Sequence, residues 1–178
     1  MAIKSFSQSP FLIGDIANKV YGARMLHMEI RTATYSDADE GSLVLRRSIG
    51  ELCGEDHGGD PAAIAGWISN KNPEMWRSWV DQEATELYVA IEAERILGVG
   101  MMDAEGEIML NYVSPDARLR GVSKALLNHM ETKARRLGLT ECSLDSTKTA
   151  RNFYQSAGYR CREGASKDDD RMTKSLVG

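Results

Sequence analysis

A short basic loop, residues 114–121, carries the clearest chemical signal in this 178-residue sequence. It contains Arg118, Arg120 and a glycine, follows an apolar run of strand length (107–113) and precedes an amphipathic stretch (122–137). Amide groups at a helix N-terminus are free to donate hydrogen bonds, and the helix dipole adds roughly half a positive charge there. Guanidinium groups add charge-assisted hydrogen bonds to phosphate oxygens. The pattern therefore indicates a site for a bulky anion, which the glycine lets approach the backbone.

The stretch 122–137 has the spacing of a helix with one apolar and one polar face. Pro115 ends the strand before it, because proline cannot donate to a strand ladder, and Gly138 supplies a helix stop. The apolar face is expected to carry Val122, Ala125, Leu126, Met130, Ala134 and Leu137. The polar face is expected to carry Lys124, Asn128, Glu131 and Arg135.

Two familiar nucleotide motifs are missing from the sequence: G-x-x-x-x-G-K-[ST] of NTPases and G-x-G-x-x-G of dinucleotide-binding proteins. The loop instead reads R-x-x-G-x-S from Arg118 to Ser123. This resembles motif A of the GNAT superfamily of acyl-CoA-dependent N-acyltransferases, in which [RQ]-x-x-G-x-[GA] binds the pyrophosphate of CoA. Ser123 departs from the usual glycine or alanine but is still small.

A second stretch, 149–159, resembles motif B of the same superfamily, A-x-x-F-Y-x-x-x-G-[FY]. All the fixed positions match, namely Ala150, Phe153, Tyr154, Gly158 and Tyr159. Thr147 stands where the family often has an asparagine that contacts CoA. The opening I-R-x-A-x-x-x-D-A at 30–38 is also similar, so that the resemblance covers about residues 29–178.

The resemblance implies an α/β (α+β) fold, with a mixed central sheet of six to seven strands and four to five flanking helices. Two parallel central strands, here 107–113 and 141–144, are expected to splay apart, with the pantetheine arm of acetyl-CoA in the V between them. The backbone groups of residues 111–113 would then be free to bond this extended ligand and to polarise the thioester carbonyl.

The resemblance also assigns roles to individual residues. Tyr154 is expected to be the general acid that protonates the departing thiolate, although a core tyrosine is the alternative reading of this position. Glu107 is expected to take a proton from the amine, with Glu92, Glu94, Asp145 and ordered water as rivals. The residues expected to bind acetyl-CoA are Asn111, Tyr112, Val113, Arg118, Leu119, Arg120, Gly121, Val122, Ser123, Lys124 and Thr147.

Local signals predict the remaining elements. Residues 28–34 alternate like a strand, and Ser36 is expected to cap a helix that runs to about Cys53. Asp60-Pro61 and Asn72-Pro73 each combine an N-cap with proline at the first helical position. A glycine-rich acidic loop is expected at 54–60, strands at 87–91 and 96–102, a helix at 149–157 and a final hairpin at 159–162 and 172–177.

The composition narrows the function classes. A net charge of −4 and the lack of a dense Lys/Arg run argue against nucleic acid as a partner. A membrane partner is not expected either, because no apolar stretch reaches the roughly 20 residues that a membrane helix needs. Three cysteines, an odd number, are typical of a reducing cytoplasm. The spacing of Cys53, Asp56, His57 and Asp60 matches no standard zinc site, and so we expect no metal.

We expect an N-terminal extension, 1–27, and a GNAT acetyltransferase domain, 28–178. The extension has one short apolar cluster, 11–13, and is a poor secretory signal. Met25 and Met28 are further candidate start sites, so we expect the extension to be either dispensable or packed against a partner.

The leading hypothesis is an N-acetyltransferase that transfers an acetyl group from acetyl-CoA to a primary amine by direct attack in a ternary complex. The amine would belong to a small molecule, a peptide N-terminus or a lysine, and a homodimer is one arrangement that the enzyme could take. The alternative is a non-catalytic acyl-CoA-binding sensory or interaction module. Acids at Glu55, Asp56 and Asp60 would favour a cationic acceptor, whose identity the sequence does not specify.

Deletion of residues 1–27 is expected to leave a folded domain that still binds acetyl-CoA, because the family-like sequence begins near Met28. The measurement is a thermal-shift titration with acetyl-CoA on the full and the shortened chain. An insoluble shortened protein, or one that loses the shift, would show that the extension belongs to the folded domain.

Overall fold

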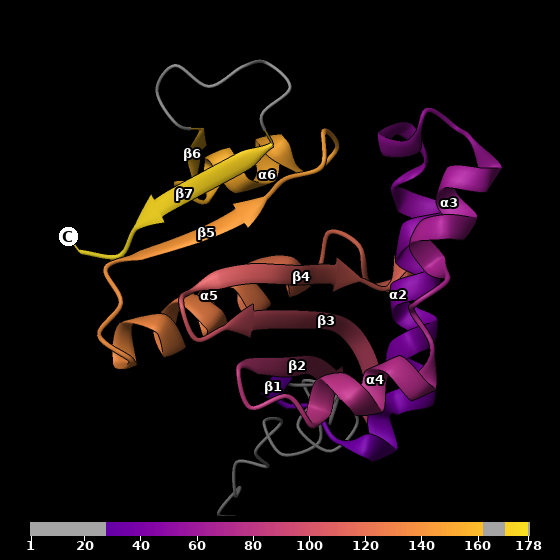
Figure 1. The fold of residues 1–178 in the computed structure, drawn as a ribbon, viewed down its shortest axis with the longest axis horizontal. Helices are drawn as coiled ribbons and strands as arrows, with labels where there is room; N and C mark the ends of the chain where they lie inside the picture. The colour runs from indigo at the N-terminus through magenta and orange to yellow at the C-terminus, as the bar shows by residue number, and fades with distance from the viewer. Residues whose placement is uncertain (1–27, 162–169, 178) are drawn as a thin grey trace, which may run out of the picture.

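The computed structural model describes residues 28–161 and 170–177, in which helices cover a seven-stranded mixed sheet (Figure 1). The predicted fold class is confirmed, whereas the predicted extension, 1–27, lies outside the described residues. The strands are β1 (Glu29–Thr32), β2 (Thr85–Glu92), β3 (Arg95–Asp103), β4 (Glu107–Val113), β5 (Glu141–Asp145), β6 (Arg160–Cys161) and β7 (Arg171–Ser175). The α-helices are α2 (Ala38–Leu52), α3 (Pro61–Ile68), α4 (Pro73–Val80), α5 (Val122–Arg136) and α6 (Arg151–Ser156). Short 3-10 helices are η1 (Tyr35–Asp37), η2 (Gly54–His57) and η3 (Pro115–Ala117).

The strand order is β1-β2-β3-β4-β5-β7-β6. Short turns join β2, β3 and β4 into an antiparallel meander, as their spacing predicts. The long crossover through α5 then brings β5 in parallel to β4, which is also the predicted arrangement. The final strands extend the sheet beyond β5, because β7 pairs with β5 and β6 pairs with β7, both antiparallel.

The pairing between β4 and β5 is short. It consists of Glu107 opposite Ser143 and Ile108 opposite Leu144, although β4 continues to pair with β3 as far as Val113. Beyond Ile108 the two parallel strands therefore separate, and Figure 1 shows β5 turning away from β4. The predicted splay of the central strands is present in the structure.

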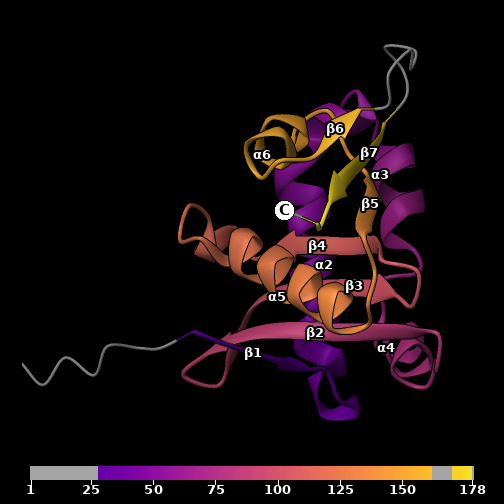
Figure 2. The ribbon, with the colours of Figure 1, turned by 90° about the vertical axis from the view of Figure 1, so that its left-hand side faces the viewer.

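Helix layers cover both faces of the sheet, with α5 and α6 on one face and α2, α3 and α4 on the other (Figure 2). Successive strand side chains point to opposite faces, so that neighbours belong to different cores. In β3, Leu97 packs in the core beneath α5, while Ile96 packs in the core beneath α2 and α4. In β2, Tyr88 and Val89 divide in the same way. The site between β4 and β5 is thus held by two packed layers.

Two helices begin where their sequence predicts. Asp60 Oδ1 accepts a hydrogen bond from Ala62 N at 2.9 Å at the start of α3. Asn72 Oδ1 accepts one from Met75 N at 2.8 Å at the start of α4. Each bond satisfies an amide that has no partner within its helix.

The prediction that Ser36 caps the first long helix was wrong. Asp37 occupies the N-cap position of α2, and Thr34 caps the preceding η1. The backbone N and the hydroxyl of Thr34 both donate to Asp37 Oδ2, at 2.7 and 2.9 Å. Arg31 of β1 also donates to both oxygens of Asp37, at 2.8 and 2.7 Å. This ion pair between the strand and the turn fixes η1, and α2 begins only at Ala38.

Helix α5 matches the predicted span to within one residue, but its buried face differs from the predicted one. Glu131, expected on the polar face, is 3% exposed, and Lys174 of β7 donates to both of its carboxylate oxygens, at 2.8 and 2.7 Å. A carboxylate is buried at acceptable cost only with such a partner. Leu137, expected on the apolar face, is 52% exposed, because α5 ends at Arg136. Leu127 is buried, which the pattern did not predict.

Three further boundaries differ from the prediction. The acidic loop 54–60 contains η2, the helix expected at 149–157 is reduced to α6, and the strand expected at 159–162 is reduced to β6. Thr147 accepts hydrogen bonds from Ala150 N through its carbonyl and its Oγ1, so a turn precedes α6. The charged part of the final hairpin, 162–169, lies outside the described residues.

Helix α5 packs directly on β3 at Gly98. A Cβ there would lie 2.7 Å from Val122 Cγ1 and 2.9 Å from the carbonyl oxygen of Tyr112. Val122 is the first residue of α5, and Tyr112 lies in the part of β4 that has left β5. This glycine therefore sets the distance between the start of α5 and the parted strand.

Gly98→Ala is expected to lower the free energy of unfolding by about 1–3 kcal/mol, the usual cost of overpacking. Gly66→Ala in α3 is the matched control, because a Cβ at Gly66 meets nothing within 4 Å. Its stability should be unchanged or raised by up to about 1 kcal/mol, since alanine favours helix over glycine. Urea unfolding of both variants measures the difference, and equal stability would contradict the tight contact at Gly98.

Candidate active site

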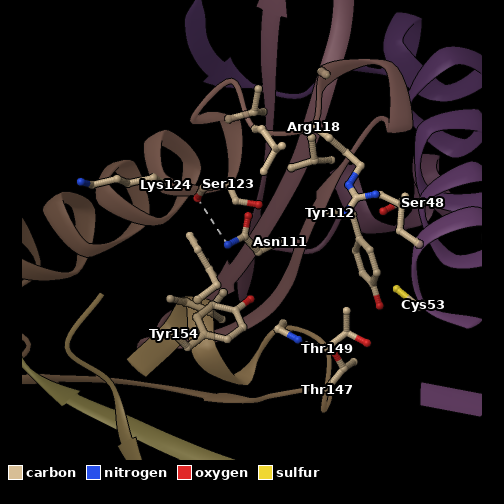
Figure 3. Close-up of a pocket in the computed structure, with 18 of the residues that line it drawn as sticks. Ser48, Cys53, Asn111, Tyr112, Arg118, Ser123, Lys124, Thr147, Thr149 and Tyr154 are labelled. Carbon is tan, nitrogen blue, oxygen red and sulfur yellow. Dashed lines mark hydrogen bonds between the residues drawn. The ribbon is translucent and has the colours of Figure 1, made fainter. Parts of the chain in front are cut away.

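A cavity of about 420 Å³ opens where β4 and β5 part (Figure 3). Its walls come from the end of α2, from β4, from the loop that contains η3, from the first turn of α5, and from the segment leading from β5 into α6. Tyr154 lines the cavity, whereas Glu107 and Arg120 do not. The other predicted site residues that line it are Asn111, Tyr112, Val113, Arg118, Leu119, Gly121, Val122, Ser123, Lys124 and Thr147.

The side chains of Asn111 and Tyr112, which are neighbours in β4, point to different parts of the cavity (Figure 3). Asn111 points toward α5, where its Nδ2 donates to the carbonyl oxygen of Ser123 at 3.4 Å. Its Oδ1 is buried and has no hydrogen-bond partner among the described residues. Tyr112 points the other way, toward Cys53 at the end of α2. A buried acceptor beside parted strands is a natural partner for a donor group of a ligand.

The loop before α5 contains two residues in the left-handed region. Leu119 has a φ of 60° and Gly121 a φ of 81°. A Cβ at Gly121 would meet no atom within 4 Å, so it is the backbone conformation, not crowding within the protein, that favours glycine here. The helix that follows has 15 residues, and its first three, Val122 to Lys124, line the cavity. This loop and helix start have the geometry of an anion site.

The two arginines of the loop have different surroundings. Arg118 lines the cavity, and its side chain extends toward Ser48 of α2 (Figure 3). Arg120 lies outside the lining and donates to both carboxylate oxygens of Glu92, at 2.8 and 2.7 Å. Glu92 ends β2 just before a tight turn, so this ion pair fastens the loop to the β2–β3 turn. The geometry therefore supports Arg118, and not Arg120, as a ligand of an anion in the cavity.

Tyr154 of α6 lies at the opposite wall of the cavity from the end of α2 (Figure 3). It is 8% exposed, and its ring makes edge contacts with Phe153 and Tyr159 at centroid distances of 5.0 and 5.8 Å. Burial raises the pKa of Tyr154 to about 12, and the side chain of Asn111 lies beside its hydroxyl. The hydroxyl therefore carries its proton at neutral pH and is placed to donate it into the cavity.

Glu107 lies at the closed end of the V, where β4 still pairs with β5. Arg171 of β7 donates to both of its oxygens, at 2.7 and 3.1 Å, and this bond lowers the pKa of Glu107. A carboxylate held in this way and outside the cavity lacks the geometry of a base for a bound amine. Two other acids were considered as the base. Glu92 is ion-paired with Arg120, and Asp145 lines the cavity but forms an ion pair with Arg171 at 3.4 Å.

Residues 55–172, about two thirds of the chain, match the family model described as the acetyltransferase (GNAT) domain. The chain belongs to the GNAT acetyltransferase family. It is therefore an acyltransferase, and the family model covers the loop before α5, α5 itself and α6.

Solved structures share the fold at low sequence identity. PaiA N-acetyltransferase from Thermoplasma acidophilum, in complex with coenzyme A, is 19% identical, covers 84% of this chain and 99% of its own, and has a TM-score of 0.73. A GCN5-related N-acetyltransferase from Rhodopseudomonas palustris is 20% identical, covers 83% of this chain and 95% of its own, and has a TM-score of 0.72. YncA from Salmonella typhimurium, with its cofactor acetyl-CoA, is 15% identical, covers 84% and 94%, and has a TM-score of 0.58. No curated protein matches the sequence significantly.

Ser48 and Leu52 of α2 and Cys53, which follows α2, line the GNAT cavity although they were not predicted from the sequence. Met109 and Thr149 also line it without having been predicted. No local pattern marks these side chains, because their approach to β4 is set by the packing of α2 on the sheet. The end of α2 thus forms one wall of the cavity.

The described residues hold no group of three or more histidine, cysteine or acidic side chains arranged to bind a metal ion. No helix within 28–161 and 170–177 is both long and apolar enough to cross a membrane.

Proposed function

We propose that this GNAT protein is an N-acetyltransferase that transfers an acetyl group from acetyl-CoA to a primary amine by direct attack in a ternary complex. One observation carries the proposal. The protonated hydroxyl of Tyr154 lies in the same cavity as the glycine loop that opens α5, at the point where β4 leaves β5. An anion site, a parted strand and an acid in one cavity are the parts that acetyl transfer from a phosphate-bearing thioester requires.

The anionic end of acetyl-CoA is assigned to the loop before α5. Its pyrophosphate would accept hydrogen bonds from the first amides of α5, with Gly121 allowing close approach and Arg118 adding charge. The pantetheine arm would lie along β4 beyond Ile108, where none of the described strands pairs on the β5 side. The complexes of PaiA with coenzyme A and of YncA with acetyl-CoA, both of this fold, support this assignment.

The reaction then requires that one proton be delivered to the departing thiolate and that two protons be removed from the amine nitrogen. The amine nitrogen, freed of its ammonium proton, attacks the thioester carbon and forms the new C–N bond, and the C–S bond breaks. The thiolate takes the Tyr154 proton, and the phenolate is restored by the second proton that the nitrogen loses. Backbone N–H groups of 111–113 are assigned to the carbonyl oxygen, on which negative charge develops.

Removal of the ammonium proton is assigned to water in the cavity. Glu107, the side chain first expected in this role, has both oxygens bound to Arg171 and lies outside the lining. The activity is placed in a reducing compartment such as the cytoplasm, because Cys53, Cys142 and Cys161 are all free thiols.

Gly121→Asp is expected to abolish the thermal shift produced by acetyl-CoA, which for a wild-type site at 100 times the Kd corresponds to about 2.7 kcal/mol. The change adds a Cβ and a negative charge where a phosphate should lie. Gly138→Asp is the matched control, because Gly138 also has a φ of 81° and open space around it, but it lies at the other end of α5. If the two variants retain the same shift, the pyrophosphate does not bind at this loop.

Tyr154→Phe is expected to reduce kcat by about 10²- to 10⁴-fold while the Kd for acetyl-CoA changes little, because only the proton donor is removed. The ring contacts with Phe153 and Tyr159 should persist. Steady-state kinetics with an amine found by a screen for thiol release, together with calorimetric titration of acetyl-CoA, measure both quantities. A Phe variant with wild-type kcat and a pre-steady-state burst in neither protein would remove this role from Tyr154.

A further inference from the structure

The side chain of Asn111 lies between the start of α5 and Tyr154 of α6 (Figure 3). Its Nδ2 donates a hydrogen bond to the carbonyl oxygen of Ser123 at 3.4 Å. The hydroxyl of Tyr154 lies beside the same amide, and both side chains line the cavity. The proposed mechanism uses only the backbone of Asn111, so this side chain has no role in it yet.

The Ser123 carbonyl determines which way the amide of Asn111 is turned. A carbonyl oxygen can only accept, so the nitrogen of the amide has to face it and the amide oxygen cannot. The Oδ1 of Asn111 is left buried, without a hydrogen-bond partner among the described residues. Because an unpaired buried acceptor is costly, this orientation is expected to gain through the nitrogen. An amide nitrogen carries two hydrogens, and Ser123 takes only one of them.

The phenolic oxygen of Tyr154 is the acceptor for the second hydrogen. Burial raises the pKa of Tyr154 to about 12, hydrogen bonding with the Asn111 side chain lowers it, and Cys53 adds a smaller rise. A hydrogen bond that lowers the pKa of an acid is one that stabilises its charged form, here the phenolate. Asn111 is therefore the donor in this contact. The proton of Tyr154 is then free to point into the cavity.

A donor at this place helps the proposed reaction at the moment of proton transfer. When the thiolate takes the proton, negative charge appears on the oxygen of Tyr154, and the Asn111 amide already faces that oxygen. The pKa of Tyr154 lies well above the value of about 8.5 that is usual for a cysteine-like thiol, so the transfer is uphill. Stabilising the phenolate reduces this cost, because acid catalysis follows acid strength.

Other polar side chains of the cavity do not take this place. Thr147 Oγ1 accepts from Ala150 N, and Tyr112 points toward Cys53 (Figure 3). Burial raises the pKa of Cys53 to about 11, so its thiol is uncharged at neutral pH and does not oppose the phenolate there.

We infer that Asn111 is a positioning residue for the proposed acid: its side-chain amide binds the Tyr154 oxygen and the Ser123 carbonyl together, directs the tyrosine proton into the cavity and stabilises the phenolate that forms. This inference rests on the proposed function and adds a residue that acts through Tyr154. Ser123 belongs to the first turn of α5, so the same amide ties the acid to the helix start at which the pyrophosphate is assigned.

The direct test places difluorotyrosine, a more acidic analogue, at the position of Tyr154 in the full chain and follows its ionisation by fluorine NMR. Asn111→Leu should raise the pKa of the analogue by about half a unit to one unit, the size of a lost neutral hydrogen bond. Asn111→Val, whose side chain suits a strand, gives the same test if the Leu variant does not fold. Asn128→Leu is the matched control, because Asn128 is exposed on α5 and lies outside the cavity lining, and it should leave the pKa unchanged.

Kinetics on the natural side chain give a second readout. Asn111→Leu should lower kcat about 3- to 10-fold with little change in the Kd for acetyl-CoA, whereas Asn128→Leu should match the wild type. In a Tyr154→Phe background the Leu change should lower kcat no further, because its effect passes through the hydroxyl. A purely structural effect would instead lower kcat equally in both backgrounds.

Three results would overturn the inference and leave Tyr154 in its proposed role. They are an unchanged pKa of the analogue, a wild-type kcat in Asn111→Leu, and a kcat loss that persists in full on top of Tyr154→Phe. If the wild type acetylates no amine, the proposed function fails instead. The NMR titration then decides whether the Asn111 amide binds the Tyr154 oxygen: a raised pKa supports the inference, and an unchanged one overturns it.

Discussion

The site depends on one broken strand ladder. β4 lies in the middle of the sheet, yet it pairs with β5 only at Glu107 and Ile108, and its remaining length faces the cavity on that side. Backbone groups in the interior of a protein are almost always hydrogen-bonded, so a strand left open in this way is an unfilled binding edge. An extended ligand with amide groups can occupy it as a further strand would. The positions of the loop, of Asn111 and of Tyr154 all follow from where this edge begins.

Several contacts hold the opening in place from outside. Gly98 lets α5 lie against β3, the Glu131–Lys174 pair fastens the same helix to β7, and Arg120 binds the loop to Glu92. At the closed end, Arg171 bridges Glu107 of β4 and Asp145 of β5. Apart from Asp145, which lines the cavity, the side chains of these ion pairs lie outside it, and together the contacts hold α5 and its loop against β2, β3 and β7. Ligand binding to a preorganised site of this kind requires little rearrangement of the protein, and so little free energy is lost to it.

Local sequence signals predicted much of the fold. Strand alternation, turn spacing and the caps at Asp60 and Asn72 each reflect interactions between residues close in the chain, and these elements formed where expected. The errors came from partners far away in sequence. From its position in the helix, Glu131 was expected on the surface, but the ion pair with Lys174 allows it to be buried. Glu107 was expected to be a base, but its ion pair with Arg171 was not visible in the sequence. Asp56 likewise accepts a hydrogen bond from Thr149 N, 93 positions later in the chain, and no periodicity could have shown that contact.

Hydrogen exchange tests the central claim most directly, because it reports on the open edge of β4 itself. Acetyl-CoA should slow amide exchange in the segment 109–113, where β4 has left β5, as the ligand takes the place of the missing strand. The segment 87–91 of β2, which is paired on both sides, serves as the internal reference and should change little. Tight binding of acetyl-CoA with no added protection of 109–113 would contradict the account, since the ligand would then lie somewhere other than between the parted strands.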